Sequence, residues 1–180
     1  IEREDKVVFV GSYYPPKYAD FITENINKKF IKLLGKGLSL SEVNLKTVYA
    51  EEGLSFPDET DFVNHMQQSY TRNISVAWLS ENTKNQVEIY GHRWDESDNK
   101  QIVFKFQGKV KKEDLNKLYN SAKYVLSASG QVINTQRLGE IIHSGAIPII
   151  YDSRDVTDEE ETWDDECLYY KTQEDLNYIL

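Results

Sequence analysis

Cysteine, proline and long apolar stretches are scarce in this sequence of 180 residues. The single cysteine, Cys167, excludes an internal disulfide framework and is typical of a protein from a reducing compartment. No apolar run approaches the ~20 residues that a membrane-spanning helix needs, and the first residues, IEREDK, are unlike a signal peptide. We therefore expect no transmembrane segment and a cytoplasmic location, which leaves room for peripheral attachment at the inner face of a membrane.

Basic residues are also in deficit, because 21 Lys and Arg stand against 30 Asp and Glu, for a formal net charge of −9. A nucleic-acid-binding protein needs a basic face to neutralise phosphates, so this balance argues against a nucleic-acid partner. His65, His92 and His143 lack the spacing of metal ligands, and no metal site is predicted. The eight carboxylates between Asp155 and Glu166 match no calcium loop, which favours a solvated surface loop.

Phosphate-binding fingerprints are missing too. The sequence contains neither GxGxxG, which marks a dinucleotide fold, nor GxxxxGK[ST], which marks a P-loop. A nucleotide site in this chain would therefore have to be built in another way.

The clearest pattern that is present runs from residue 124 to 151. It predicts a buried strand (124–129), a polar loop, a helix (134–144) and a second buried strand (146–151), which is a βαβ crossover and so implies a parallel sheet. The same reasoning predicts strands at 6–11, 86–91, 103–108 and 167–170, and helices at 17–34, 113–124 and 172–180. Strands alternating with helices indicate a doubly wound α/β sheet in a single domain, residues 1–180, with a helical insertion at about 38–85, after the first helix.

The start of the helix predicted at 134–144 is the best candidate for a binding site, since ligands bind beyond the carboxyl ends of parallel strands. Gly130 would let a ligand approach the backbone, and Asn134 and Thr135 stand beside free helix N–H groups that favour a diphosphate. Arg137 and Glu140 are three residues apart and share a flank of the helix. Two interpretations remain open: a surface ion pair, or a cation for phosphate beside a carboxylate for a ribose diol.

The first strand opens onto the same edge of the sheet. It ends in Gly11 and Ser12, a glycine-containing turn of the kind that leaves room for a bound group. Tyr13, Tyr14 and Trp94 also lie at strand ends, where a base or a sugar could stack on their rings.

Five segments follow one another in the order of a known family: FVGSYYPPK, EIYGHRW, FKFQGKVKKEDLNKLYNSAKYVLSAS, NTQRLGEIIHSGAIPII and ETWDDECLYYKTQEDLNYIL. Together they resemble the C-terminal, donor-binding half of a GT-B glycosyltransferase, most closely the spore-maturation-protein-like group. The resemblance covers nearly the whole chain apart from about 38–73. The segment RLGEIIHSGAIPIIYD is also similar to the exostosin-like glycosyltransferases, which would keep the reaction type and change the substrate.

The resemblance implies a Rossmann-like domain that binds a nucleotide-diphosphate sugar, such as a UDP- or GDP-sugar, with no cofactor required. It places Glu140 at the ribose hydroxyls and puts Arg137, Asn134 and Thr135 at the diphosphate. It also implies a space for phosphate or sugar at Gly11 and Ser12, a base-binding backbone at 108–110, and further cations in Lys109 and Arg93.

Two departures from the family pattern matter. Many retaining relatives carry a glutamate eight residues before the one that matches Glu140, and this chain has Val132 there. The catalytic residues and the stereochemical outcome therefore stay open. A GT-B enzyme also needs an N-terminal domain for its acceptor (glycan, lipid or protein), and the chain starts with Ile rather than Met.

We accordingly expect the chain to be the donor-binding fragment of a hexosyltransferase and to be inactive without its acceptor-binding domain. The alternative is a non-catalytic, regulatory nucleotide-binding module with the same fold.

Overall fold

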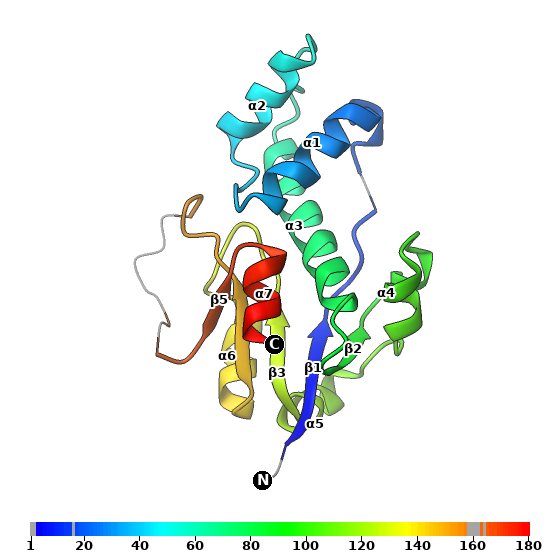
Figure 1. Ribbon diagram of the computed structural model, residues 1–180, viewed down its shortest axis with the longest axis vertical. Coiled ribbons are helices and arrows are strands. Elements are labelled where there is room, and N and C mark those ends of the chain that lie inside the picture. Colours follow the sequence, from blue (N-terminus) through cyan, green and yellow to red (C-terminus); the bar gives the residue numbers. More distant parts are fainter. Residues whose placement is uncertain (1–2, 16, 158–162, 164) are drawn as a thin grey trace.

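The computed structural model describes residues 3–15, 17–157, 163 and 165–180. Its centre is a five-stranded sheet in the order β2-β1-β3-β4-β5, in which every neighbouring pair is parallel (Figure 1). The strands are β1 (Glu4–Val10), β2 (Gln86–Tyr90), β3 (Ala122–Ser127), β4 (Ile147–Tyr151) and β5 (Leu168–Tyr170). The predicted doubly wound, Rossmann-like α/β fold is confirmed.

Strand β1 lies inside the sheet and is buried on both faces, as its unbroken apolar run predicts. Val7 and Phe9 face the side of the sheet covered by α3 (Phe62–Ser80) and α7 (Gln173–Ile179). Val8 and Val10 face the opposite side. The chain runs from β1 outward to β2 and then returns to β3 on the other side of β1, so the strand order reverses there, and a ligand crevice is expected at the carboxyl ends of β1 and β3.

The remaining helices cover the sheet and extend beyond its carboxyl edge. Helices α5 (Lys112–Ser121) and α6 (Gln136–Ser144) pack against each other on the face of Val8, while α1 (Glu24–Gly35) and α2 (Glu42–Glu51) stand above the strand ends (Figure 1). Helices α2 and α3 occupy the stretch predicted as a helical insertion. Across the described ranges, no helix is both long enough and apolar enough to cross a bilayer.

One predicted strand is absent, and one predicted helix begins later than expected. Residues 103–108 do not form a strand, because Asn99 caps the helix α4 (Lys100–Lys105), accepting hydrogen bonds from the backbone N–H of Gln101 and Ile102. The segment meets the sheet after the helix, where Phe106 forms a single parallel bridge to Ile89 and the Gln107 N–H donates to the Ile89 carbonyl over 2.8 Å. The apolar–polar alternation of VFKF looked like a strand, but it arises from one short helical turn whose Phe104 is 82% exposed.

The helix predicted at 17–34 begins later than expected. A 3₁₀ turn (Ala19–Phe21) comes first, and α1 begins after Thr23, whose hydroxyl accepts a hydrogen bond from the N–H of Ile26. Helical spacing of apolar residues extends across this cap, so the pattern alone could not locate it.

Helix α6 contains a glycine that its position does not require. Apart from its chain neighbours and the backbone of its own helix, no atom of the described residues lies within 4 Å of the place where a Cβ on Gly139 would be. Gly139→Ala is therefore expected to raise the free energy of unfolding by about 0.5–1 kcal/mol, because alanine loses less backbone entropy in a helix. Urea denaturation would measure the change, and Gly35→Ala, equally open but at the last residue of α1, should give a smaller gain. A loss of stability at Gly139 would contradict the open space.

Candidate functional site

A cleft of about 300 Å³ opens where β1 and β2 end, at the carboxyl edge of the sheet. This is the edge at which the strand order predicts a ligand. The residues that line it include Gly11, Ser12, Arg72, His92, Lys109 and Arg137.

The floor of the cleft is made by two loops that continue the pairing of β1 with β2. Gly11 N–H donates to the Tyr90 carbonyl over 2.9 Å, and Tyr13 N–H donates to the His92 carbonyl over 2.9 Å. The Trp94 indole N–H then donates to the Gly11 carbonyl over 2.6 Å. Trp94 is fully buried by this arrangement, so the expectation that its ring stacks on a ligand is wrong.

Arg137 enters the cleft from the first turn of α6. Its guanidinium donates to the Val10 carbonyl at the end of β1. A Cβ at residue 11 would lie 3.2 Å from Nη1 of Arg137 and 2.8 Å from Cζ of Phe9. Gly11 therefore provides the space through which the arginine reaches the strand end.

Arg72 approaches from the other side, on α3. Its guanidinium carbon lies 4.5 Å from the centroid of the Tyr14 ring. Its Nε is buried and has no hydrogen-bond partner in the described part of the chain. Burial lowers the pKa of Arg72, the Tyr14 side chain opposes that shift, and the positive charge of Arg137 adds a smaller lowering.

No ion pair within the described ranges involves Arg72, Lys109 or Arg137. Two neighbouring guanidinium groups without a carboxylate are costly, because burial weakens their hydration and their charges repel each other. An anion would remove that cost. Guanidinium groups match phosphate oxygens particularly well, since their N–H groups form a fixed fork that can bind two oxygens at once.

Glu140 faces a different cavity, of about 340 Å³, between α5 and α6. Leu115, Tyr119 and His143 also line it. Glu140 accepts a hydrogen bond from Gln136 over 2.9 Å and makes no ion pair with Arg137, which removes the surface-pair interpretation.

Tyr119 belongs to the lining of this second cavity. Its hydroxyl is buried and has no hydrogen-bond partner among the residues described. Burial raises the pKa of Tyr119 to about 12, while Arg137 lowers it and Glu140 raises it. The charges of the arginine of the cleft and of the carboxylate of the second cavity therefore both act on this buried hydroxyl.

Of the eight binding residues predicted from the sequence, four line the cleft: Gly11, Ser12, Lys109 and Arg137. Arg93 does not, and its guanidinium instead pairs with Glu96 over 2.6 Å on an exposed turn. Thr135 and Asn134 also lie outside the lining. The Thr135 hydroxyl caps α6 by accepting from the Leu138 N–H over 3.1 Å, and Asn134 accepts a hydrogen bond from the Trp163 indole.

Gly130 serves helix packing and not a ligand. A Cβ there would lie 2.4 Å from the carbonyl oxygen of Gln67 and 2.6 Å from Oγ1 of Thr71, both on α3. The glycine thus lets the loop after β3 press against that helix.

Arg72 was missed by the sequence reasoning, although a signal existed. It is the only Asp, Glu, Lys or Arg among the 19 residues of α3. A lone cation in a long helix that packs into a core needs a reason, and an anion near its head group would supply one.

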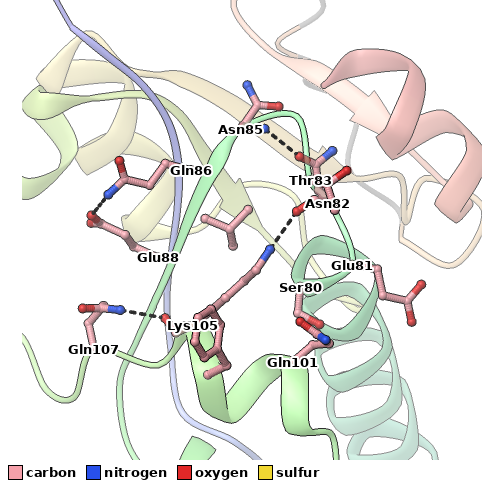
Figure 2. A pocket seen from close by; sticks show the side chains of 12 residues that line it. Ser80, Glu81, Asn82, Thr83, Asn85, Gln86, Glu88, Gln101, Lys105 and Gln107 are labelled. Carbon is pink, nitrogen blue, oxygen red and sulfur yellow. Dashed lines mark hydrogen bonds between the residues drawn. The ribbon is translucent and has the colours of Figure 1, made fainter.

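A larger cavity, of about 690 Å³, lies elsewhere, where α4 approaches the start of β2 (Figure 2). The Lys105 ammonium points across it and donates to the Asn82 carbonyl over 2.7 Å (Figure 2). Burial lowers the pKa of Lys105. This cavity is at the amino end of β2, away from the edge where ligands of parallel sheets bind.

Acidic and metal-binding side chains give no further candidate. In the ranges the structure covers, no three His, Cys, Asp or Glu residues are grouped so that they could hold a metal ion. The acidic loop predicted at 155–166 lies largely outside the described residues.

Comparison with known proteins supplies the family. None of the curated proteins compared with the chain matches it. The model of the glycosyl transferase-like family matches residues 71–180, more than half of the chain. The match begins one residue before Arg72 and includes Lys109, Arg137 and Glu140. The chain therefore belongs to the glycosyl transferase-like family.

Proposed function

We propose that the chain is the donor-binding domain of a GT-B glycosyltransferase, and that its cleft holds the diphosphate of a nucleotide sugar. The observation that carries the proposal is the pair Arg72 and Arg137, two neighbouring guanidinium groups that face one cleft without a carboxylate. Lys109 adds a third cation to the same lining.

These cations would act mainly when the sugar leaves. As the bond between the anomeric carbon and the β-phosphate oxygen breaks, negative charge grows on the diphosphate. Fixed positive groups stabilise that charge more than they stabilise the intact donor, which lowers the barrier. The acceptor hydroxyl forms the new bond to the anomeric carbon, and its proton passes to a base that we assign to the acceptor-binding domain.

The nucleoside would extend from the cleft into the cavity between α5 and α6. Glu140 lines that cavity, and its carboxylate can accept hydrogen bonds from both hydroxyls of a ribose. Tyr119 lines the same cavity, and its buried hydroxyl has no hydrogen-bond partner among the described residues. Donor binding would thus span both cavities, with Arg137 and Glu140 contacting different parts of one molecule.

The remaining parts of the proposal concern the whole enzyme. An N-terminal domain of the same polypeptide would bind the acceptor, as in the spore-maturation-protein-like group that the sequence resembles. The transferred group would be a hexosyl unit from a UDP- or GDP-sugar, with no metal required. The isolated domain would bind the donor but transfer little sugar. We expect the enzyme to be located in the cytoplasm or at the inner face of a membrane.

Nucleotide binding tests the proposal. UDP, GDP, CDP and dTDP, each with its common sugars, are compared by thermal shift, and one of them at about 100 times its Kd should add about 2.7 kcal/mol of stability. Glu140→Gln is expected to raise that Kd roughly 10-fold, because a hydrogen bond to a charged group contributes about 1.5–3 kcal/mol.

Glu42→Gln is the matched control, since Glu42 lies on α2 and pairs only with Lys46 in the described ion pairs. It should leave the Kd unchanged. Absence of any nucleoside diphosphate binding at millimolar concentration would refute the proposed function, and an unchanged Kd in Glu140→Gln would remove Glu140 from the site.

A further inference from the structure

The outer edge of β2 is only partly covered. Strand β2 stands at one end of the sheet, so β1 pairs with one of its edges and the other edge faces outward. On the outward edge, the Gln107 N–H donates to the Ile89 carbonyl over 2.8 Å, and the Gly91 N–H donates to the Gly108 carbonyl over 2.9 Å. These bonds cover the carboxyl end of the strand. Within the described residues, no backbone bond of this kind covers its amino half.

Val87 carries the backbone groups that are left unpaired. In a strand of a parallel sheet, the N–H and C=O groups of every second residue point to the same edge. Ile89 faces outward through its bond to Gln107, whereas Tyr90 faces β1 because its carbonyl accepts from the Gly11 N–H. Val87 lies two residues before Ile89, so its N–H and C=O also face outward. Unpaired backbone groups on an edge strand are a template for pairing with another chain.

The cavity of about 690 Å³ adjoins this uncovered half, and Val87 is among the residues that line it (Figure 2). We call it the edge groove. Its lining is rich in carboxamides, which come from Asn82, Asn85, Gln86, Gln101 and Gln107. A carboxamide carries the same donor and acceptor groups as a peptide bond, so it can pair with the backbone of an extended chain. The Oδ1 of Asn85 is buried and has no hydrogen-bond partner in the described part of the chain.

The apolar part of the edge groove is open to solvent. Phe104 lines the groove from α4, and its side chain is 82% exposed. A chain laid along β2 could cover this ring. Binding by strand addition uses such a combination, since main-chain hydrogen bonds supply affinity and contacts with alternate side chains supply selectivity.

Lys105 determines the charge that fits the groove. Its ammonium points across the groove to the Asn82 carbonyl and forms no ion pair in the ranges that the structure describes (Figure 2). Both glutamates of the lining have other partners, because Glu81 accepts a hydrogen bond from α7 over 2.6 Å and Glu88 pairs with Lys6 over 3.5 Å. Burial lowers the pKa of Lys105, and neither glutamate offsets this. A carboxylate on the bound chain would supply the missing partner.

The turn at the end of the groove favours a side-chain carboxylate over the terminus of a chain. Capture of a terminal carboxylate uses a nest of free backbone N–H groups. The N–H groups of Lys84 and Asn85 instead donate to Oδ1 of Asn82, over 3.1 and 3.0 Å. An acidic side chain needs only the ammonium.

We propose that the edge groove binds an extended segment of a partner protein, which adds a strand beside β2 and places an acidic side chain at Lys105. The proposal does not depend on the proposed function, because none of the residues that line the edge groove lines the cation cleft.

Amide hydrogen exchange tests the added strand. The probes are acetylated and amidated octapeptides in which valine and threonine alternate around a central glutamate. The Val87 N–H should exchange at least about 10-fold more slowly when peptide saturates the groove, because pairing removes it from water. The Glu88 N–H faces β1 in the free protein, so its exchange rate should not change.

The ion pair is tested by affinity, measured as fluorescence anisotropy of labelled peptide. Lys105→Met is expected to raise the Kd about 10-fold. Lys100→Met, on the same helix but outside the lining, is the matched control and should leave the Kd unchanged. Replacing the glutamate of the peptide by glutamine should weaken binding to the unaltered protein by the same factor and have no effect on binding to Lys105→Met, since both changes remove one contact.

Phe104→Ala keeps the test valid if Lys105→Met fails to fold, because the Phe104 side chain is already exposed. It should weaken peptide binding about 5-fold or more. Tyr178→Ala removes another exposed aromatic ring, on α7 and outside the lining, and should change nothing.

Slower exchange at Val87 together with the coupled loss at Lys105 supports the proposal. Absence of peptide binding at millimolar concentration, unchanged exchange at Val87 in the complex, or an unchanged Kd in both Lys105→Met and Phe104→Ala overturns it. Equal affinity for free glutarate would indicate a simple anion site, and dimerisation that Lys105→Met abolishes would indicate a second copy of the chain as the occupant. Either result also overturns the proposal. Nucleotide affinity should be the same in Lys105→Met, so failure here leaves the proposed function intact.

Discussion

Arg72→Met is expected to weaken the binding of a nucleoside diphosphate roughly 10- to 100-fold while leaving the free protein at least as stable as before. The loss of affinity follows because hydrogen bonds between charged groups contribute about 1.5–3 kcal/mol, and 1.4 kcal/mol corresponds to a factor of ten. Titration calorimetry with the tightest nucleoside diphosphate measures it. Arg137 cannot replace the lost contacts in full, because its Nη1 already donates to the Val10 carbonyl.

The expected effect on stability has the opposite sign to that of most buried substitutions. Burial lowers the pKa of Arg72, Arg137 adds repulsion, and the Nε has no partner within the described residues. Methionine removes the unpaired charge and keeps a long side chain whose sulfur can pack on the Tyr14 ring. Denaturant unfolding without ligand should therefore show an unchanged or higher midpoint.

Arg154→Met is the matched control for the loss of a stacked arginine. The Arg154 guanidinium carbon lies 4.6 Å from the centroid of the Tyr169 ring, and Arg154 pairs with Asp152 over 2.7 Å outside the cleft. Its replacement should leave nucleotide affinity unchanged and lower stability by no more than about 1 kcal/mol. If Arg72→Met instead destabilised the protein and left affinity unchanged, Arg72 would be a structural residue.

The parts of the fold that the sequence predicts well are those in which local pattern and burial agree. Strands β1, β3 and β4 are nearly continuous apolar runs in the middle of a parallel sheet, and α6 ends at a glycine after a clear apolar face. Helix α4 was missed because its three apolar residues read equally well as a strand, and the Asn99 side chain, which caps the helix, decides between the two.

The binding site shows a different limit. A helical wheel correctly places Arg137 and Glu140 on one flank of α6, but it cannot show what packs against that flank. Arg137 lines the cleft at the ends of β1 and β2, whereas Glu140 lines the cavity between α5 and α6 together with Tyr119 of α5. Arg72 joins the cleft from α3, which is about 65 residues earlier in the chain, so no local pattern connects it to Arg137. Only the packing of α3 against the sheet brings the two cations together.

Gly91→Ala is expected to cost roughly 3–5 kcal/mol of stability, a large share of the ~5–15 kcal/mol typical of a folded domain. Gly91 has a φ of +139°, and a Cβ there would lie 1.9 Å from the carbonyl oxygen of Gly11. That oxygen also accepts the Trp94 indole N–H, so the loop after β1 cannot move away without breaking a buried hydrogen bond. Strain at a glycine-only conformation adds about 1–3 kcal/mol to the steric clash.

Gly53→Ala separates the two contributions. Gly53 also has a positive φ, +67°, but no atom lies within 4 Å of its added Cβ, so only the left-handed conformation is penalised, by about 1–2 kcal/mol. Denaturant midpoints of the two variants give the difference directly. Equal losses would mean that the loops after β1 and β2 do not touch as described. A much larger loss at Gly91, with nucleotide binding abolished, would mean that the contact between Gly91 and Gly11 holds together the floor on which the diphosphate rests.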